Sequence, residues 1–188
     1  MLRKRLCFNA QSSFIPLLVL NVFMVSLLPS IARAGQFGGR SYFDHSPRLV
    51  RTTTNNVTSH ALATYEFTIA VPPDAGAALQ TVKIAQVENL DRVSFNSTHR
   101  RAYLDEGVAK GQSVSLAAIG GEQPNDRSET TVTFDPPIQP GQVVTVALDA
   151  TLNPWHSGIY LFGVTAYPEG DQTSGLFLGF GRVQLLSQ

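Results

Sequence analysis

Apolar and polar residues alternate with a period of two in several parts of the chain. The alternation is cleanest in residues 61–71, where Tyr65, Phe67 and Ile69 share one face and mostly polar residues share the other. A period of two is typical of a β-strand with one buried face. Residues 81–87 repeat the pattern, so we expect these two strands to pair across the loop that joins them.

Three further runs are rich in β-branched and aromatic residues. They cover residues 130–134, 143–148 and 159–167, with prolines and a glycine between the first two. Because proline fixes φ and lacks an N–H donor, residues 135–141 should form a compact turn. We predict that the strands on either side of this turn pair. The third run is apolar on both faces, which predicts a strand in the centre of a sheet.

Shorter strands are predicted at residues 49–54, 93–95, 113–118 and 176–186, and a helical turn or two at residues 98–105. In the last strand, Gly179 and Gly181 predict a bulge, a bend or a close backbone approach. The total is eight or nine strands with short connections. This pattern predicts an all-β fold, an antiparallel two-layer sandwich of immunoglobulin-like type without the cysteines of antibody domains. A small closed β-barrel is the main alternative.

The N-terminus has the order of a secretory signal. Basic residues at positions 3–5 precede an apolar run over residues 14–28, and an Ala-Arg-Ala motif ends at Ala34. We therefore expect residues 1–34 to be a signal peptide. A membrane anchor is the alternative, but the run is shorter than the roughly 20 residues that a spanning helix needs. The protein is expected in the periplasm or outside the cell, with a thylakoid lumen as a further option.

The rest of the chain is predicted to be one domain, residues 42–188, after a flexible glycine-rich lead at residues 35–41. The single cysteine, Cys7, lies in the predicted signal peptide, so the domain has no disulfide. The first 34 residues hold four of the 14 basic residues and none of the 14 acidic ones. The remainder then carries ten basic and 14 acidic residues, a net charge of −4. This charge disfavours nucleic acid as a partner, and we expect no membrane span once the signal is removed.

Four histidines, His45, His60, His99 and His156, are the weak candidates for a metal site. Imidazole and carboxylate groups suit copper or zinc. However, the spacing gives neither His-x-His nor His-Glu-x-x-His, and both methionines lie in the predicted signal peptide. We therefore expect four independent histidines and no cofactor. A periplasmic copper- or zinc-binding carrier is the alternative.

The only tryptophan, Trp155, lies in a loop between two predicted core strands. Its side chain is either a plug over the end of the sandwich or an exposed anchor for a partner or a glycan. The same two interpretations apply to Arg100, Arg101 and Tyr103, the other weak candidates for binding.

No nucleophile motif supports catalysis, because Gly-x-Ser-x-Gly is absent and no cysteine remains after the predicted signal peptide. We therefore predict no catalytic residues. The expected function is a non-catalytic interaction module of the cell envelope or exterior, with an envelope protein or polysaccharide as partner. An envelope hydrolase is the second alternative.

Several motifs in a fixed order carry a resemblance to a known family. They lie at residues 43–49, 63–69, 133–141 and 158–170, within a similarity that covers roughly residues 42–183. On these residues the chain resembles a family of exported cyanobacterial proteins that carry a single domain of unknown function. The resemblance implies export and a β-rich domain. It implies no activity and no site residues.

Overall fold

The structure is a computed structural model, and the residues that it describes are 35–37, 40–87, 89–105, 110–117 and 129–187. The chain divides into two units, Met1–Ile31 and Ala32–Gln188, and all of the described residues belong to the second. The predicted signal peptide lies outside the described residues. Within them, no helix is long and apolar enough to cross a membrane.

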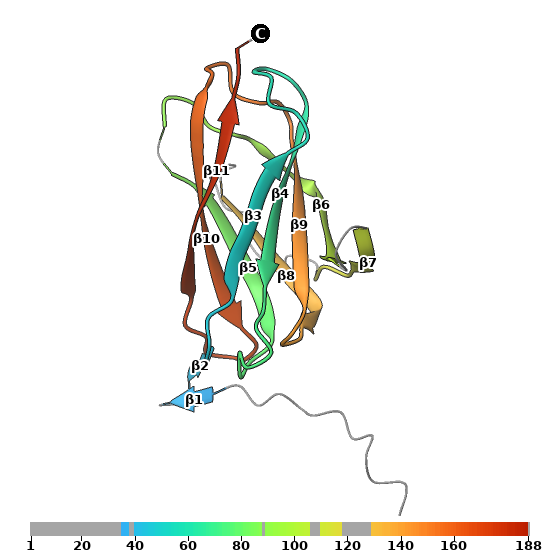
Figure 1. The fold of residues 1–188 in the computed structure, drawn as a ribbon, viewed down its shortest axis with the longest axis vertical. Coiled ribbons are helices and arrows are strands. Elements are labelled where there is room, and N and C mark those ends of the chain that lie inside the picture. Colours follow the sequence, from blue (N-terminus) through green and yellow to red (C-terminus); the bar gives the residue numbers. More distant parts are fainter. Residues whose placement is uncertain (1–34, 38–39, 88, 106–109, 118–128, 188) are drawn as a thin grey trace, which may run out of the picture. The chain divides into compact units, whose positions relative to one another are not determined.

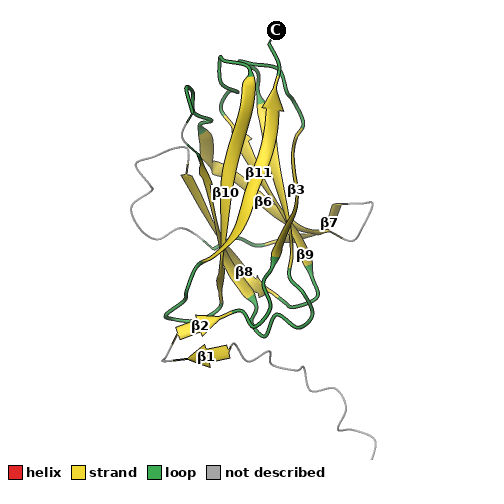
Figure 2. Cartoon of the chain, turned by 60° about the vertical axis from the view of Figure 1, so that its left-hand side comes forward, coloured by secondary structure: helices red, strands yellow, loops and turns green. Residues whose placement is uncertain are grey.

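Strands form all of the regular secondary structure in the described residues, and Figure 2 shows only strands and loops there. In chain order they are β1 (Gly35–Phe37), β2 (Arg40–Tyr42), β3 (Arg48–Thr54), β4 (Ala63–Ala70), β5 (Leu79–Gln86), β6 (Phe95–Asp105), β7 (Lys110–Val114), β8 (Glu129–Ile138), β9 (Val143–Ala150), β10 (Gly158–Pro168) and β11 (Leu176–Leu185).

Antiparallel pairing arranges these strands in two larger sheets and one two-stranded sheet. The larger sheets have the orders β11-β10-β5-β8 and β3-β4-β9-β6-β7, and β1 pairs with β2. The two larger sheets share one hydrophobic core, and neither closes on itself (Figure 1). The predicted all-β sandwich of immunoglobulin-like type is therefore confirmed, with eleven described strands in place of eight or nine.

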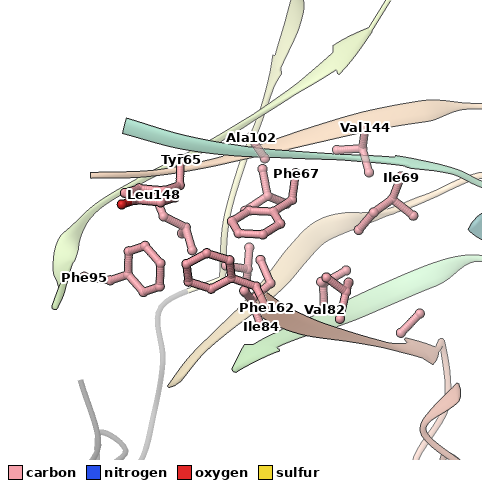
Figure 3. Packing of buried hydrophobic residues seen from close by; sticks show 14 of the residues in the cluster. Tyr65, Phe67, Ile69, Val82, Ile84, Phe95, Ala102, Val144, Leu148 and Phe162 are labelled. Carbon is pink, nitrogen blue, oxygen red and sulfur yellow. The ribbon is translucent and has the colours of Figure 1, made fainter. Parts of the chain in front are cut away.

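Aromatic side chains from both sheets meet in the core. Tyr65 and Phe67 of β4 are fully buried against Phe162 of β10 (Figure 3). The ring of Phe162 meets Tyr65 edge-on at 5.5 Å and Phe67 at 5.6 Å between centroids, and Phe95 lies 5.9 Å away. Edge-to-face pairs of this kind stabilise beyond the apolar area that they bury. The buried face predicted for residues 61–71 is thus confirmed.

Two of the predicted strand pairings are wrong. β8 and β9 flank the turn at residues 135–141 but belong to different sheets, and so do β4 and β5. At both places the chain crosses from one layer to the other, which is usual in sandwiches with Greek-key connections. β10 lies between β11 and β5, as predicted for a central strand, but only one of its faces is buried.

The helical turn predicted at residues 98–105 is also wrong, because these residues belong to β6. Arg100 to Leu104 pair with β9, and Ala102 points into the core with 2% exposure. A helix of this length is unstable on its own, whereas pairing with a buried neighbouring strand satisfies the backbone and buries the apolar residue.

The irregularity predicted from the glycines of β11 is confirmed. The register between β10 and β11 shifts beside Gly179, which has a φ of +119°. Gly181 lies against the side chain of Thr52 in β3, with no room for a Cβ atom. The bulge leaves Phe177 and Phe180 on the outer face of the sheet, where their rings meet at 5.0 Å.

The segment at residues 35–41, for which the sequence predicts a flexible lead, contains β1 and part of β2. Ser41 N–H donates to the carbonyl of Gln172 at 2.8 Å, and its own carbonyl accepts from Ser174 N–H at 3.2 Å. These bonds add a β-bridge between Ser41 and Thr173. The glycine content of the segment therefore does not keep it from pairing.

Candidate functional site

Three loops come together at one end of the sandwich, which we call the loop end. They are residues 55–62, 89–94 and 151–157. Asn153 N–H donates to the carbonyl of Ala61 at 2.7 Å, which joins the first loop to the third. Figure 1 shows these two loops at the end where the C-terminus is marked. The loop end holds Trp155, His60 and His156 of the predicted binding and metal candidates.

The buried side chain of Asn153 holds the loop end together. Its Nδ2 donates to the carbonyls of Asn56 at 3.0 Å and Thr58 at 2.8 Å. Its Oδ1 accepts from the hydroxyl of Tyr65 at 2.6 Å. Burial raises the pKa of Tyr65 above its ordinary value, and nearby Tyr160 adds to the rise. The phenol therefore stays protonated and keeps donating to Asn153 at physiological pH.

Trp155 stacks on His60 at the loop end. The two rings are 3.6 Å apart between centroids, with 19° between their planes. His60 has a φ of 56°, a left-handed conformation that is uncommon for a residue with a side chain. Its N–H donates to the carbonyl of Pro154 at 3.1 Å. Because Trp155 is still 69% exposed, the stack supports one side of the indole and leaves the rest accessible.

His156, the next residue, turns to the neighbouring loop. Its Nδ1 lies 2.7 Å from Oδ2 of Asp91, and its backbone N–H donates to the same oxygen at 3.1 Å. The hydrogen bond from the His156 side chain, followed by the one from its backbone, lowers the pKa of Asp91. The hydroxyl of Tyr160 donates to the carbonyl of His156 at 2.8 Å. These bonds fix the residue that follows Trp155.

The four histidines do not converge. His60 and His156 lie at the loop end, whereas His45 binds the carbonyl of Asp74 at 2.9 Å in the loop that follows β4, at the opposite end. His99 lies on the outer face of the five-stranded sheet, 4.0 Å from a carboxylate. Among the described residues, no group of three or more histidine, cysteine or acidic side chains could hold a metal ion.

Arg100, Arg101 and Tyr103 lie on β6 and not at the loop end. Arg100 crosses to the other sheet and donates to the carbonyl of Thr131 at 2.9 Å, and burial lowers its pKa. Arg101 binds an aspartate on the outer face, and the hydroxyl of Tyr103 donates to Glu66 at 2.7 Å. Arg100 points to the opposite face from Arg101 and Tyr103, because alternate residues of a strand point to opposite faces. The three side chains therefore form no single site, since each has a different partner.

Sequence reasoning missed Asn153, Asp91 and Asp149. Asn153 has no sequence signal beyond its place before Pro154, because burial of a loop residue depends on tertiary packing. Asp149 did leave a signal, since it is the one charged residue in the apolar run of β9. Its outward side chain accepts from Arg101 and from the hydroxyl of Thr64 at 2.7 Å.

Comparisons with known proteins give one family. The family described as "Protein of unknown function (DUF2808)" matches residues 40–185. The comparison with curated proteins gives no match.

Several solved structures are similar to this chain at low identity. A protein from Nocardia farcinica, described as having an immunoglobulin-like fold, is 16% identical, with a TM-score of 0.38 and coverage of 72% of this chain and 96% of its own. The collagen-binding domain of a Staphylococcus aureus adhesin is 5% identical, with a TM-score of 0.36 and coverage of 72% and 95%. AggA, the major subunit of an Escherichia coli adherence fimbria, is 9% identical, with a TM-score of 0.36 and coverage of 77% and 97%. Similarity at this level says nothing of function.

Proposed function

Since the chain belongs to the DUF2808 family, whose description assigns no activity, we propose a function from the geometry of the loop end. The protein is a non-catalytic interaction module of the cell envelope or exterior. Its main contact is the stack of Trp155 on His60, which binds an envelope protein or polysaccharide.

The exposure of a supported tryptophan is the observation that carries this proposal. Trp155 is 69% exposed, although burial of the indole would remove a large apolar surface from water. The stack on His60 restricts the ring before any partner arrives, so little side-chain entropy is lost on binding. Exposed, preorganised tryptophans are frequent energetic centres of interfaces. The Asn153 hydrogen bonds join the loop that carries Trp155 to the loop that carries His60.

The location rests on the N-terminal sequence, where a basic start, an apolar run and Ala34 have the order of a secretory signal. The absence of reactive motifs in the sequence supports binding in place of catalysis. At the loop end, the Nδ1 of His156 pairs with Asp91 and the ring of His60 lies against Trp155, so both imidazoles have structural partners.

A direct test uses Trp155 as its own reporter. It is the only tryptophan of the chain, so a partner that covers the loop end changes the emission of the protein. We expect envelope polysaccharide or envelope protein fractions to shift this emission and to co-sediment with the protein. Trp155→Ala should lose co-sedimentation. The matched control is Phe177→Ala, which removes an aromatic ring of 53% exposure from the outer face of β11.

If Trp155→Ala co-sediments as well as the unchanged protein, the stack is not the contact and the proposal is wrong. The same preparation tests the two alternatives. Sub-millimolar binding of Cu(II) or Zn(II) that disappears when His45, His60, His99 and His156 become alanine would favour the metal carrier. Turnover of an esterase, peptidase or glycosidase substrate would favour the hydrolase.

A further inference from the structure

A groove of about 420 Å³ lies on the outer face of the five-stranded sheet, beside the loop end. Small-molecule sites commonly have volumes of roughly 300–1,000 Å³. Leu62 and Ala63 line one part of the groove, and Asn96, Arg101 and Asp149 line another. The groove therefore combines an apolar wall with hydrogen-bonding groups.

A bulge in β6 shapes this groove. Phe95 pairs with Ala150 and Arg100 pairs with Leu148, so four residues of β6 stand opposite the single residue Asp149. Bulges of this kind redirect side chains and are frequent beside functional sites. Oδ1 of Asn96 accepts from the backbone N–H and the hydroxyl of Thr98, at 3.0 and 2.8 Å, and so fixes the start of the bulge. Asn96 and His99, at the two ends of the bulge, both line the groove.

The charges in the groove cancel. Arg101 donates to both oxygens of Asp149, at 3.0 and 2.7 Å, and the hydroxyl of Thr64 donates to one of them. Burial alone would raise the pKa of Asp149, but the hydrogen bonds from Thr64 and Arg101 outweigh it and hold the pKa below its ordinary value. The pair uses only two N–H donors of Arg101, which leaves others for a ligand. A neutral molecule with many hydroxyl groups fits such a site better than an ion does.

The apolar wall of the groove offers a ligand a hydrophobic contact. Leu62 is 72% exposed and borders the groove. The C–H face of a sugar ring can pack on an aliphatic side chain of this kind while its hydroxyls bind the polar side. Leu62 also lies in the same loop as His60, and Thr151 of the groove precedes Trp155 in the other loop of the stack. The groove and the stack thus share their two supporting loops.

We propose that this groove binds a saccharide unit of a neutral glycan, with Arg101 and Asp149 bonding its hydroxyls and Leu62 packing on its C–H face. The inference rests on the proposed function, and it names polysaccharide as the partner class. A protein partner that binds the stack alone would satisfy the proposed function but not this inference.

The test is an array of neutral and acidic oligosaccharides, followed by calorimetric titration of the best neutral ligand. We expect millimolar or tighter binding of at least one neutral oligosaccharide. Arg101→Ala should weaken it by about tenfold or more, because hydrogen bonds from a charged donor are lost. Leu62→Ala should weaken it without disturbing the ion pair. Arg182→Ala, which removes an exposed arginine from the other sheet, should change the affinity less than twofold.

The outcomes separate the two proposals. Loss of affinity in Trp155→Ala, with unchanged affinity in both Arg101→Ala and Leu62→Ala, would overturn the groove and leave the stack as the contact. Unchanged affinity in all three variants would overturn the groove and would show that the stack does not bind this oligosaccharide, while the proposed function would still be tested by co-sedimentation with envelope protein. Failure to bind any neutral oligosaccharide, or binding of acidic ones alone, would also overturn the groove. Circular dichroism of each variant checks that it is folded.

Discussion

Replacing Asn153 with alanine should loosen the loop end more than any other single change there. Asn153 is 2% exposed, and its amide makes three hydrogen bonds at 2.6 to 3.0 Å. The carbonyl of Asn56 keeps a bond from the hydroxyl of Thr54 at 3.1 Å. The Tyr65 hydroxyl and the carbonyl of Thr58 lose the partner that Asn153 supplies. The change therefore leaves two polar groups unpaired, one of them on a fully buried side chain.

The magnitude follows from those two groups. A buried polar group left without a partner costs about 1–3 kcal/mol. The Tyr65 hydroxyl should bear most of that penalty, while water can reach the half-buried Thr58. We expect the free energy of unfolding to fall by about 2–4 kcal/mol, a large share of the roughly 5–15 kcal/mol of a typical domain.

A double-mutant cycle isolates the buried pair. Tyr65→Phe alone leaves Oδ1 of Asn153 unpaired and should cost about 1–3 kcal/mol. In the double variant neither partner remains. Its loss of unfolding free energy should therefore be smaller than the summed losses of the two single variants, by about 1 kcal/mol or more. Strictly additive costs would mean that the bond between Tyr65 and Asn153 contributes no coupling.

Unfolding in guanidinium chloride, followed by circular dichroism and by Trp155 emission, measures these costs. Asn89→Ala is the matched control, because the exposed Asn89 donates to the carbonyl of Ile159 at 3.0 Å from a neighbouring loop. Its loss should cost about 1 kcal/mol or less. If Asn153→Ala costs no more than Asn89→Ala, the account of the loop end is refuted.

Three further predictions concern the core, a turn and pH. In the same denaturant assay, Phe162→Ala should lower the free energy of unfolding by about 3–5 kcal/mol. Its control is Ile159→Ala, which should cost less than about 1 kcal/mol because Ile159 is half-exposed. Gly76→Ala should cost about 1–2 kcal/mol, because its φ is +72° and a Cβ atom would meet the side chain of Asp44; adding Asp44→Ala should restore only part of the loss. The pKa of Asp91 is lowered in the fold from its ordinary value of 3.8. Its carboxylate therefore stabilises the folded state at pH values above 3.8, and this stabilisation is lost as the pH falls through the folded-state pKa. Asp91→Asn should therefore flatten the acid side of the curve of melting temperature against pH, and an unchanged slope would contradict the assignment.

The sequence predicted which face of a strand is buried better than it predicted which strands pair. Burial of Tyr65 and Phe67 follows from local alternation, since side chains on a strand alternate between its two faces. Pairing depends on whether the chain crosses between layers after a turn, and the turn at residues 135–141 has the same composition in either case. The pairing of Arg100 and Ala102 with β9 was missed for a related reason, because the stability of a strand comes from its neighbours.

The candidate site was predictable in its parts but not in its assembly. Trp155 and the histidines could be named from the sequence, and so could the two interpretations of the tryptophan. The stack of Trp155 on His60 could not be predicted from the sequence, because it joins loops that are about 95 residues apart and depends on a left-handed φ at His60. The bonds of Asn153 connect the same distant loops. Long-range loop contacts of this kind leave no local pattern in the sequence.

The loop end separates the side chains that hold the loops from those that are exposed to solvent. Asn153 and Tyr65 are buried, whereas Trp155 and Leu62 are 69% and 72% exposed. Substitution of an exposed side chain usually changes stability little. A loss of binding in Trp155→Ala or Leu62→Ala therefore reports a lost contact. A loss in Asn153→Ala reports displaced loops, and it should be accompanied by a lower free energy of unfolding.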